Sequence, residues 1–222
     1  MTPEIIFEDN HLLAINKPAG WLVQGDRTGD KTLTDWGKDY LKNKYAKPGA
    51  VFLHPVHRID RPVSGAVLFA RTDKALSRLT TLFREKKVVK TYLALVLRRP
   101  EKPAGELRHF LLKDEKKNVV TAHSHPFKDA KESITCYEMM GPAGDYFLLR
   151  VSPLTGRPHQ IRAQLAAMGC PIAGDLKYGA PAALPDASIG LHCLRMELVH
   201  PVRLEMILVE APFPVKDWWR VP

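Results

Sequence analysis

The chain has 222 residues, of which 33 are Lys or Arg and 24 are Asp or Glu, for a formal net charge of +9. Hydrophobic residues make up 45% of the chain, a share typical of globular proteins, which excludes a wholly disordered chain. No apolar run reaches the roughly 18–20 residues that a membrane-spanning helix needs, and the N-terminus lacks the pattern of a signal peptide. We therefore expect a cytoplasmic protein that does not span a membrane.

The positive charge suits a polyanionic partner such as nucleic acid, although a surface that serves only solubility would also explain it. The chain has three cysteines, Cys136, Cys170 and Cys193, too far apart for a CxxC pair. An odd and sparse set argues against a disulfide framework. We expect three reduced, partly buried thiols.

Turn residues divide the chain into short strands and three helices. Strands are expected at residues 5–7, 12–15, 66–70, 88–97, 107–112, 133–139, 146–151, 196–200 and 204–210. Helices are expected over 32–45, from Thr72 or Asp73 to about 86, and over 158–168, with Pro158 in the first turn. Strands outnumber helices, and short turns join most neighbours. The sequence therefore predicts an α+β fold, a mixed and largely antiparallel sheet with packed helices.

Several common catalytic motifs are absent from the sequence. There is no GxGxxG or GxxxxGK[ST] segment, so neither a dinucleotide-binding nor a P-loop protein is predicted. The nine histidines form no HExxH motif and the cysteines no CxxC motif, so we expect no metal. Ser64-Gly65 does not supply the GxSxG elbow of a serine hydrolase.

Residues 57–65 (HRIDRPVSG) hold the densest group of candidate functional side chains. Asp60 lies between Arg58 and Arg61, just before an apolar run. Loops at strand ends are where rigid scaffolds present reactive groups, and nearby cations favour an ionised carboxylate. Asp60 is thus a candidate nucleophile or base. A structural Asp–Arg pair that caps a turn is the alternative.

Residues 154–162 (LTGRPHQIR) combine a glycine turn with the expected start of a helix, where backbone N–H groups favour anions. His159 and Arg162 are three residues apart and share a helical face. Together with Arg157 they could converge on a phosphate or a carboxylate. Solvated basic residues at an ordinary helix start would give the same pattern.

Tyr92 lies on the strand expected at residues 88–97. A tyrosine can donate a proton, accept one when ionised, or stack on a base. A strand tyrosine that only packs in the core is the alternative.

Taken together, these segments resemble the RluA family of RNA pseudouridine synthases, and they occur in the order that the family has. The resemblance spans roughly residues 4–212 and rests on NKPAG at 16–20, HRIDRPVSG at 57–65, KTYLA at 90–94, LTGRPHQIR at 154–162, PIAGDLKY at 171–178 and LH at 191–192. The departures are small. Ile59 stands for Leu, Val63 for Thr, and Gln164 for a frequent His.

This resemblance implies the pseudouridine synthase catalytic fold, as a single domain over residues 1–222. Because the first expected hairpin begins almost at Met1, we expect no S4 RNA-binding domain. The implied partner is tRNA or rRNA. The short chain and the Arg61-Pro62 continuation favour the branch that modifies tRNA. No cofactor is implied, and we expect a monomer because no long exposed apolar element stands out.

The resemblance also implies roles for individual residues. Asp60 is the catalytic carboxylate, Arg162 pairs with it, and Tyr92 stacks on the uracil and assists proton removal from C5. Arg58 is expected to occupy the space that the flipped base leaves. Weaker candidates for contacts to the RNA backbone or the pocket are Arg157, His159 and His192.

Two other functions compete with the enzyme. A catalytically idle RNA-binding or RNA-folding protein could use the same scaffold, although Asp60, Tyr92 and Arg162 are all present. A metal-dependent hydrolase acting on nucleic acid would need a cluster of metal ligands, which the sequence lacks.

Overall fold

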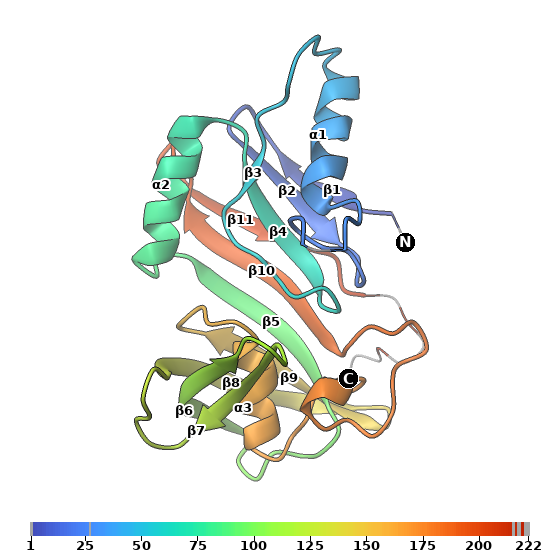
Figure 1. Cartoon of the computed structure of the whole chain (residues 1–222), viewed down its shortest axis with the longest axis vertical. Helices are drawn as coiled ribbons and strands as arrows, with labels where there is room; N and C mark the ends of the chain where they lie inside the picture. The colour runs from blue at the N-terminus through green and yellow to red at the C-terminus, as the bar shows by residue number, and fades with distance from the viewer. Residues whose placement is uncertain (1, 27, 215, 217–218, 220–222) are drawn as a thin grey trace. The chain divides into compact units, whose positions relative to one another are not determined.

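The computed structural model describes residues 2–26, 28–214, 216 and 219. The chain forms two compact units, which we describe separately (Figure 1). Unit 1 consists of Met1–Val89 with Cys193–Pro212, and unit 2 of Lys90–His192 with Phe213–Pro222. The single catalytic domain expected from the sequence stays a prediction.

Unit 1 is a sheet with two helices. Its strands are β1 (Glu4–Glu8), β2 (Leu12–Lys17), β3 (His54–Pro55), β4 (Ser64–Ala70), the greater part of β10 (Leu191–Val199) and β11 (Met206–Glu210). The neighbours run β1-β2-β4-β10, while β3 pairs with β4 and β11 with β10. The expected N-terminal hairpin is confirmed, since β1 and β2 pair antiparallel.

The middle strands β2 and β4 form the core of unit 1. Leu12–Ile15 and Ala66–Ala70 are completely buried, which explains why both segments are unbroken apolar runs rather than alternating ones. Helix α1 (Leu33–Lys44) packs closely on β2, because a Cβ at Gly37 would lie 3.3 Å from the Ile15 side chain. Helix α2 (Asp73–Arg84) contacts β4.

Both helices of unit 1 begin at a threonine cap. Thr32 accepts a hydrogen bond from the backbone N–H of Asp35 while the Asp35 carboxylate accepts one from the N–H of Thr32, a complete capping box. Thr72, rather than Asp73, caps α2 by accepting from the backbone N–H of Ala75. Both helices therefore start where the sequence predicts.

Unit 2 is an antiparallel sheet covered by one helix. Its strands are β5 (Val89–Val96, with Val89 in unit 1), β6 (Ala104–Asp114), β7 (Val119–His123), β8 (Lys131–Ala143) and β9 (Tyr146–Pro153), in the order β5-β9-β8-β6-β7. Helix α3 (Gln160–Ala167) contacts β6, β7, β8 and β9. A 3-10 turn follows at Leu176–Tyr178.

Unit 2 also holds two differences from the expected elements. Strand β7 was not expected, because its five residues include the polar Thr121 and His123. Helix α3 begins at Gln160, so Pro158 is not in its first turn. His159 adopts a left-handed backbone with φ 48°, and a residue in that conformation cannot continue a right-handed helix.

The remaining expectations concern the cysteines and the membrane. Cys136 is half-buried, and Cys170 and Cys193 are buried. Among the described residues, none of the helices has the length and apolar character needed to cross a bilayer.

Candidate active site

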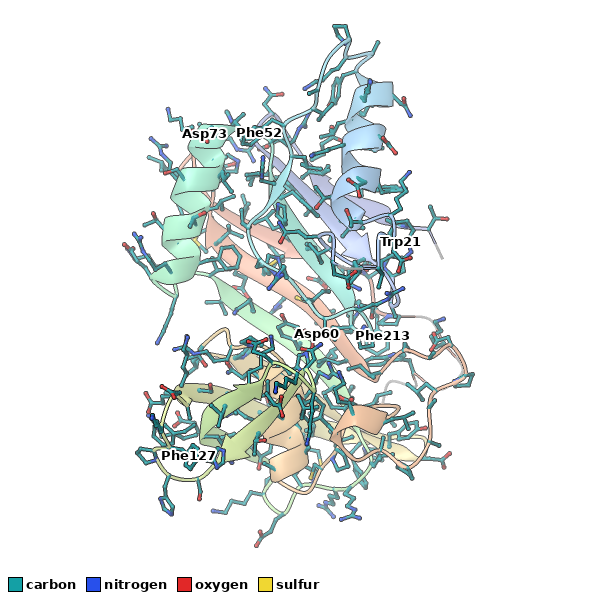
Figure 2. All side chains as sticks on the ribbon, viewed as in Figure 1. Trp21, Phe52, Asp60, Asp73, Phe127 and Phe213 are labelled. Carbon is teal, nitrogen blue, oxygen red and sulfur yellow. The ribbon has the colours of Figure 1, made fainter. Side chains whose placement is uncertain are left out.

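Asp60 lies in the loop between β3 and β4 of unit 1 (Figure 2). Ile59 and Val63 are buried, so they anchor the loop on both sides of the carboxylate. The backbone N–H of Val63 donates to the carbonyl oxygen of Asp60 at 3.0 Å, which closes a tight turn. Asp60 itself is half-buried and Arg58 is exposed. The loop thus presents these two side chains on a fixed backbone.

The buried ammonium of Lys17 ties this loop to the turn after β2. Lys17 is completely buried, and its Nζ donates to the carbonyl oxygens of Pro18, Trp21 and Arg61 at 3.0, 2.9 and 3.1 Å. Burial lowers the pKa of Lys17 to about 7, and the nearby Asp60 carboxylate acts in the opposite direction. Lys17 therefore fixes the carbonyl group of Arg61, the residue after Asp60.

Further contacts hold the two ends of the loop. The N–H of Gly20 donates to the Arg61 carbonyl at 2.8 Å, and Arg61 Nε donates to the Gly20 carbonyl at 3.0 Å. His57 Nε2 accepts from the backbone N–H of Leu68 at 3.0 Å, and its ring stacks on Phe83 with centroids 5.2 Å apart. His57 thus joins the loop to β4 and α2.

Gly65 joins the loop to β4 at a position that needs glycine. Its φ is +113°, and a Cβ there would lie 2.2 Å from the carbonyl oxygen of Cys193 on β10. No side chain fits such a contact. The close approach of β4 and β10 therefore fixes the start of β4, where the Asp60 loop ends.

Unit 2 holds the candidates Tyr92 and Arg162. Tyr92 lies on β5 opposite Val151 of β9 and is 9% exposed. Arg162 lies on α3, and its Nε and Nη2 donate to the two carboxylate oxygens of Asp175 at 2.7 and 2.8 Å. Arg162 is 5% and Asp175 1% exposed. This buried pair is the strong bidentate kind, and sequence reasoning missed Asp175.

Tyr178 connects Arg162 with His159. The Arg162 guanidinium lies 5.0 Å from the centroid of the Tyr178 ring, and the Tyr178 hydroxyl lies 2.8 Å from His159 Nδ1. That hydroxyl also accepts from the backbone N–H of Val120 at 2.9 Å. The Tyr178 hydroxyl therefore joins His159 to the backbone of β7.

The remaining candidates have less distinctive surroundings. Arg157 is exposed, and its Nε donates to the carbonyl oxygen of Glu132 at 3.4 Å. His192 is buried, and its ring lies edge-on to Trp219 with centroids 6.3 Å apart. The expected pairing of Arg162 with Asp60, and the RNA contacts of Arg58, Arg157, His159 and His192, stay predictions.

Two buried glutamines orient the segment that carries Arg162. Gln160 accepts from the Arg157 backbone N–H at 3.0 Å and donates to the Ile134 carbonyl at 3.0 Å. Gln164 accepts from the Thr135 hydroxyl at 2.7 Å and donates to carbonyl oxygens of β6 and β8. Both side-chain amides therefore have hydrogen-bond partners in the core, and they fix the position of α3 on the sheet.

Within the described part of the chain, no three His, Cys, Asp or Glu side chains lie close enough together to hold a metal ion.

Comparison with known proteins identifies the class to which these loops belong. Residues 11–167 match the model of a family described as RNA pseudouridylate synthase. The match covers the Asp60 loop, Tyr92 and Arg162. The protein is therefore an RNA-modifying isomerase by class, and the chain belongs to the RNA pseudouridylate synthase family.

Individual relatives agree with this assignment. The chain is 35% identical to the ribosomal large subunit pseudouridine synthase C of Rickettsia felis, over 96% of this chain and 68% of the relative. It is 29% identical to the tRNA pseudouridine synthase C of Vibrio parahaemolyticus, over 98% of this chain and 92% of the relative. The chain thus spans about two thirds of the length of the ribosomal relative.

The solved structures confirm the fold. Human RNA Pseudouridylate Synthase Domain Containing 4 superimposes with a TM-score of 0.78 at 25% identity, covering 95% of this chain and 88% of that one. The family and the α+β fold expected from the sequence are both confirmed.

Proposed function

We propose that this chain converts specific uridines of structured RNA into pseudouridine, with Asp60 as the catalytic carboxylate. Family membership supports the reaction. The observation that carries the assignment to Asp60 is its place on an anchored loop, where Lys17 binds the neighbouring carbonyl of Arg61 at 3.1 Å. A carboxylate used for covalent or proton chemistry needs such a fixed backbone.

The proposed reaction breaks one bond and forms another at the same ribose carbon. The N1–C1′ bond of the uridine breaks, the uracil turns, and C5 bonds to C1′. The proton lost from C5 is balanced by the one gained at N1, so the product is an isomer and no co-reactant is consumed. Asp60 acts either as the nucleophile at C1′ or as the base at C2′.

Arg162 and Tyr92 assist in this proposal. Arg162 pairs with Asp60 and keeps it ionised, while Asp175 holds the guanidinium by two of its nitrogens. Tyr92 stacks on the uracil and takes part in removal of the C5 proton.

The target base must leave its stack before the reaction, at a cost of a few kcal/mol. Arg58 is exposed on the same loop as Asp60, which suits a side chain that fills the vacated space. Arg157, His159 and His192 supply contacts to the RNA backbone or to the pocket.

The substrate is proposed to be rRNA or tRNA, because the curated relatives are named for each of these RNAs. A cytoplasmic location and a monomeric state belong to the same proposal. Pseudouridine mapping in total RNA distinguishes the two substrates.

Release of tritium from RNA that carries 5-tritiated uridine tests the proposed function. We expect release by the wild type, no release by Asp60→Asn, and normal release by Asp73→Asn. Asp73 is an exposed aspartate in the first turn of α2 and serves as the matched control. Absence of release by the wild type from every cellular RNA fraction, or full release by Asp60→Asn, would contradict the proposal.

A further inference from the structure

Phe127 is a large apolar side chain on the surface of unit 2. It is 54% exposed and lies in the loop between β7 and β8 (Figure 2). The backbone N–H of Ala130 donates to the Phe127 carbonyl at 3.0 Å, which closes a tight turn. The loop therefore presents the ring from a fixed backbone.

The ring of His123 supports Phe127 from one side. The two rings are stacked, with centroids 4.7 Å apart and planes 8° from parallel. His123 is the last residue of β7 and pairs with Phe110 of β6, so the sheet holds it in place. His123 stacks on one face of Phe127, and the residue is still 54% exposed, which suits stacking of a further planar group.

The surroundings of Phe127 suit a polyanion. His125, Lys128 and Lys131 are exposed on the same loop and at the start of β8. Within the described residues neither Lys128 nor Lys131 makes an ion pair, and Asp129 is the single acid at positions 124–131. Two exposed lysines within four residues of an exposed aromatic ring suit a nucleotide, with its phosphate and its base.

We infer that the exposed face of Phe127 is a stacking site for an unpaired nucleobase of the bound RNA, with Lys128 and Lys131 contacting the adjacent phosphates. This inference rests on the proposed function, because it names a contact to the same RNA by residues that are not part of the Asp60 loop. Stacking on an aromatic ring is independent of base identity and needs only an unpaired base. The site therefore contributes affinity rather than sequence choice.

The test measures binding in the Asp60→Asn background, so that turnover does not alter the probe. The probes are a short fluorescein-labelled oligouridylate and an abasic oligonucleotide of the same length and charge. Phe127→Ala is expected to weaken binding of the oligouridylate roughly 5- to 150-fold and to leave binding of the abasic probe unchanged. Phe127→Tyr is expected to restore the affinity.

Two control variants separate stacking from charge and from general damage. Phe52→Ala removes an exposed phenylalanine of unit 1 that lies near His54 at a tilt of 52°, and it should leave both affinities unchanged. The double variant Lys128→Ala/Lys131→Ala should weaken binding of both probes to the same extent. It should also reduce the slope of log K against log salt concentration.

Equal binding of the oligouridylate by Phe127→Ala and its parent would overturn the inference. So would an unchanged RNA affinity combined with a change in sedimentation mass, since Phe127 would then contact a second copy of the chain. Failure of the proposed function gives a different result. The wild-type protein would then release no tritium, whereas the binding measurements in the Asp60→Asn background would be unaffected.

Discussion

Lys17, Arg162 and Asp175 are charged side chains that the fold removes from water. Burial of an unpaired charge is costly, so each must find partners inside the protein. Lys17 donates to three carbonyl oxygens, and Arg162 and Asp175 bind each other through two hydrogen bonds. These residues hold the segments that carry the proposed chemistry.

Replacement of Asp175 by alanine should destabilise the protein strongly. Removal of Asp175 takes two charge-assisted hydrogen bonds from the buried Arg162 guanidinium, and the free energy of unfolding should fall by about 3–5 kcal/mol. Asp39→Ala breaks the exposed pair with Lys31, whose side chains are 60% and 57% exposed, and should cost less than about 1 kcal/mol. Urea unfolding of both variants checks this, and equal losses would contradict the described geometry.

His200 is a buried histidine with backbone donors at one ring nitrogen and a carboxylate close to the other. Its Nδ1 accepts from the backbone N–H groups of Val202 and Arg203 at 3.2 and 2.9 Å, and its Nε2 lies 2.9 Å from an Asp9 carboxylate oxygen. Burial lowers the pKa of His200, with the Asp9 charge acting against this shift. The native state therefore favours the neutral ring.

This lowered pKa predicts a loss of stability in acid. The unfolded histidine takes up a proton near pH 6.5, whereas the folded one does so only at lower pH. Stability is therefore full above about pH 6.5 and declines as the pH falls through the folded pKa.

The urea midpoint should accordingly decrease between about pH 7 and pH 5, and the decrease should be smaller in His200→Asn, which does not titrate. The pKa of His109 is also lowered by burial, so only the difference between the two proteins reports on His200. The exposed His125→Asn is the control substitution. Identical slopes for His200→Asn and the wild type would contradict the prediction.

At the scale of elements, local sequence signals located most helices and strands. The threonine caps of α1 and α2 and the Asp9-Asn10 turn act on their own neighbours in the chain, so they can be read from the sequence. Strand β7 and the start of α3 could not be read from the sequence. The first depends on pairing with β6 and the second on the left-handed backbone of His159, and neither leaves a strong local pattern.

Gly65, at the junction of the Asp60 loop with β4, is expected to tolerate no side chain. Gly65→Ala should unfold the protein at markedly lower temperature and reduce activity, because its Cβ would lie 2.2 Å from the Cys193 carbonyl oxygen. Gly20→Ala is the matched control, since Gly20 has φ +87° and open space around it.

The strain of a left-handed alanine alone costs about 1–2 kcal/mol, so Gly65→Ala should lose clearly more stability than Gly20→Ala. Thermal unfolding of the two variants measures the difference. Equal losses would mean that the close approach of β4 to β10 tolerates a side chain.

At the scale of the whole molecule, the residues of the proposed site were found from motifs, whereas their supports were not. Asp60, Tyr92 and Arg162 were named through the family resemblance, because residue type alone left a structural alternative for each. Lys17 reaches Arg61 across 44 positions of sequence, and Asp175 reaches Arg162 from outside its helix. Such pairs depend on the folded chain and have no signature in spacing.

The basic residues of the chain fall into a buried and an exposed group. Of the 33 basic residues, Lys17 and Arg162 are buried, while Arg58, Lys128 and Lys131 are exposed. We predict that these exposed charges contribute an affinity for RNA that weakens as the salt concentration rises.

We propose that this chain makes pseudouridine through Asp60. Pseudouridine mapping of total RNA from cells that lack the gene, complemented with the wild type or with Asp60→Asn, tests it most directly. We predict that at least one site in rRNA or tRNA is lost on deletion, returns with the wild type and does not return with Asp60→Asn. An unchanged map on deletion, or full restoration by Asp60→Asn, would contradict the claim.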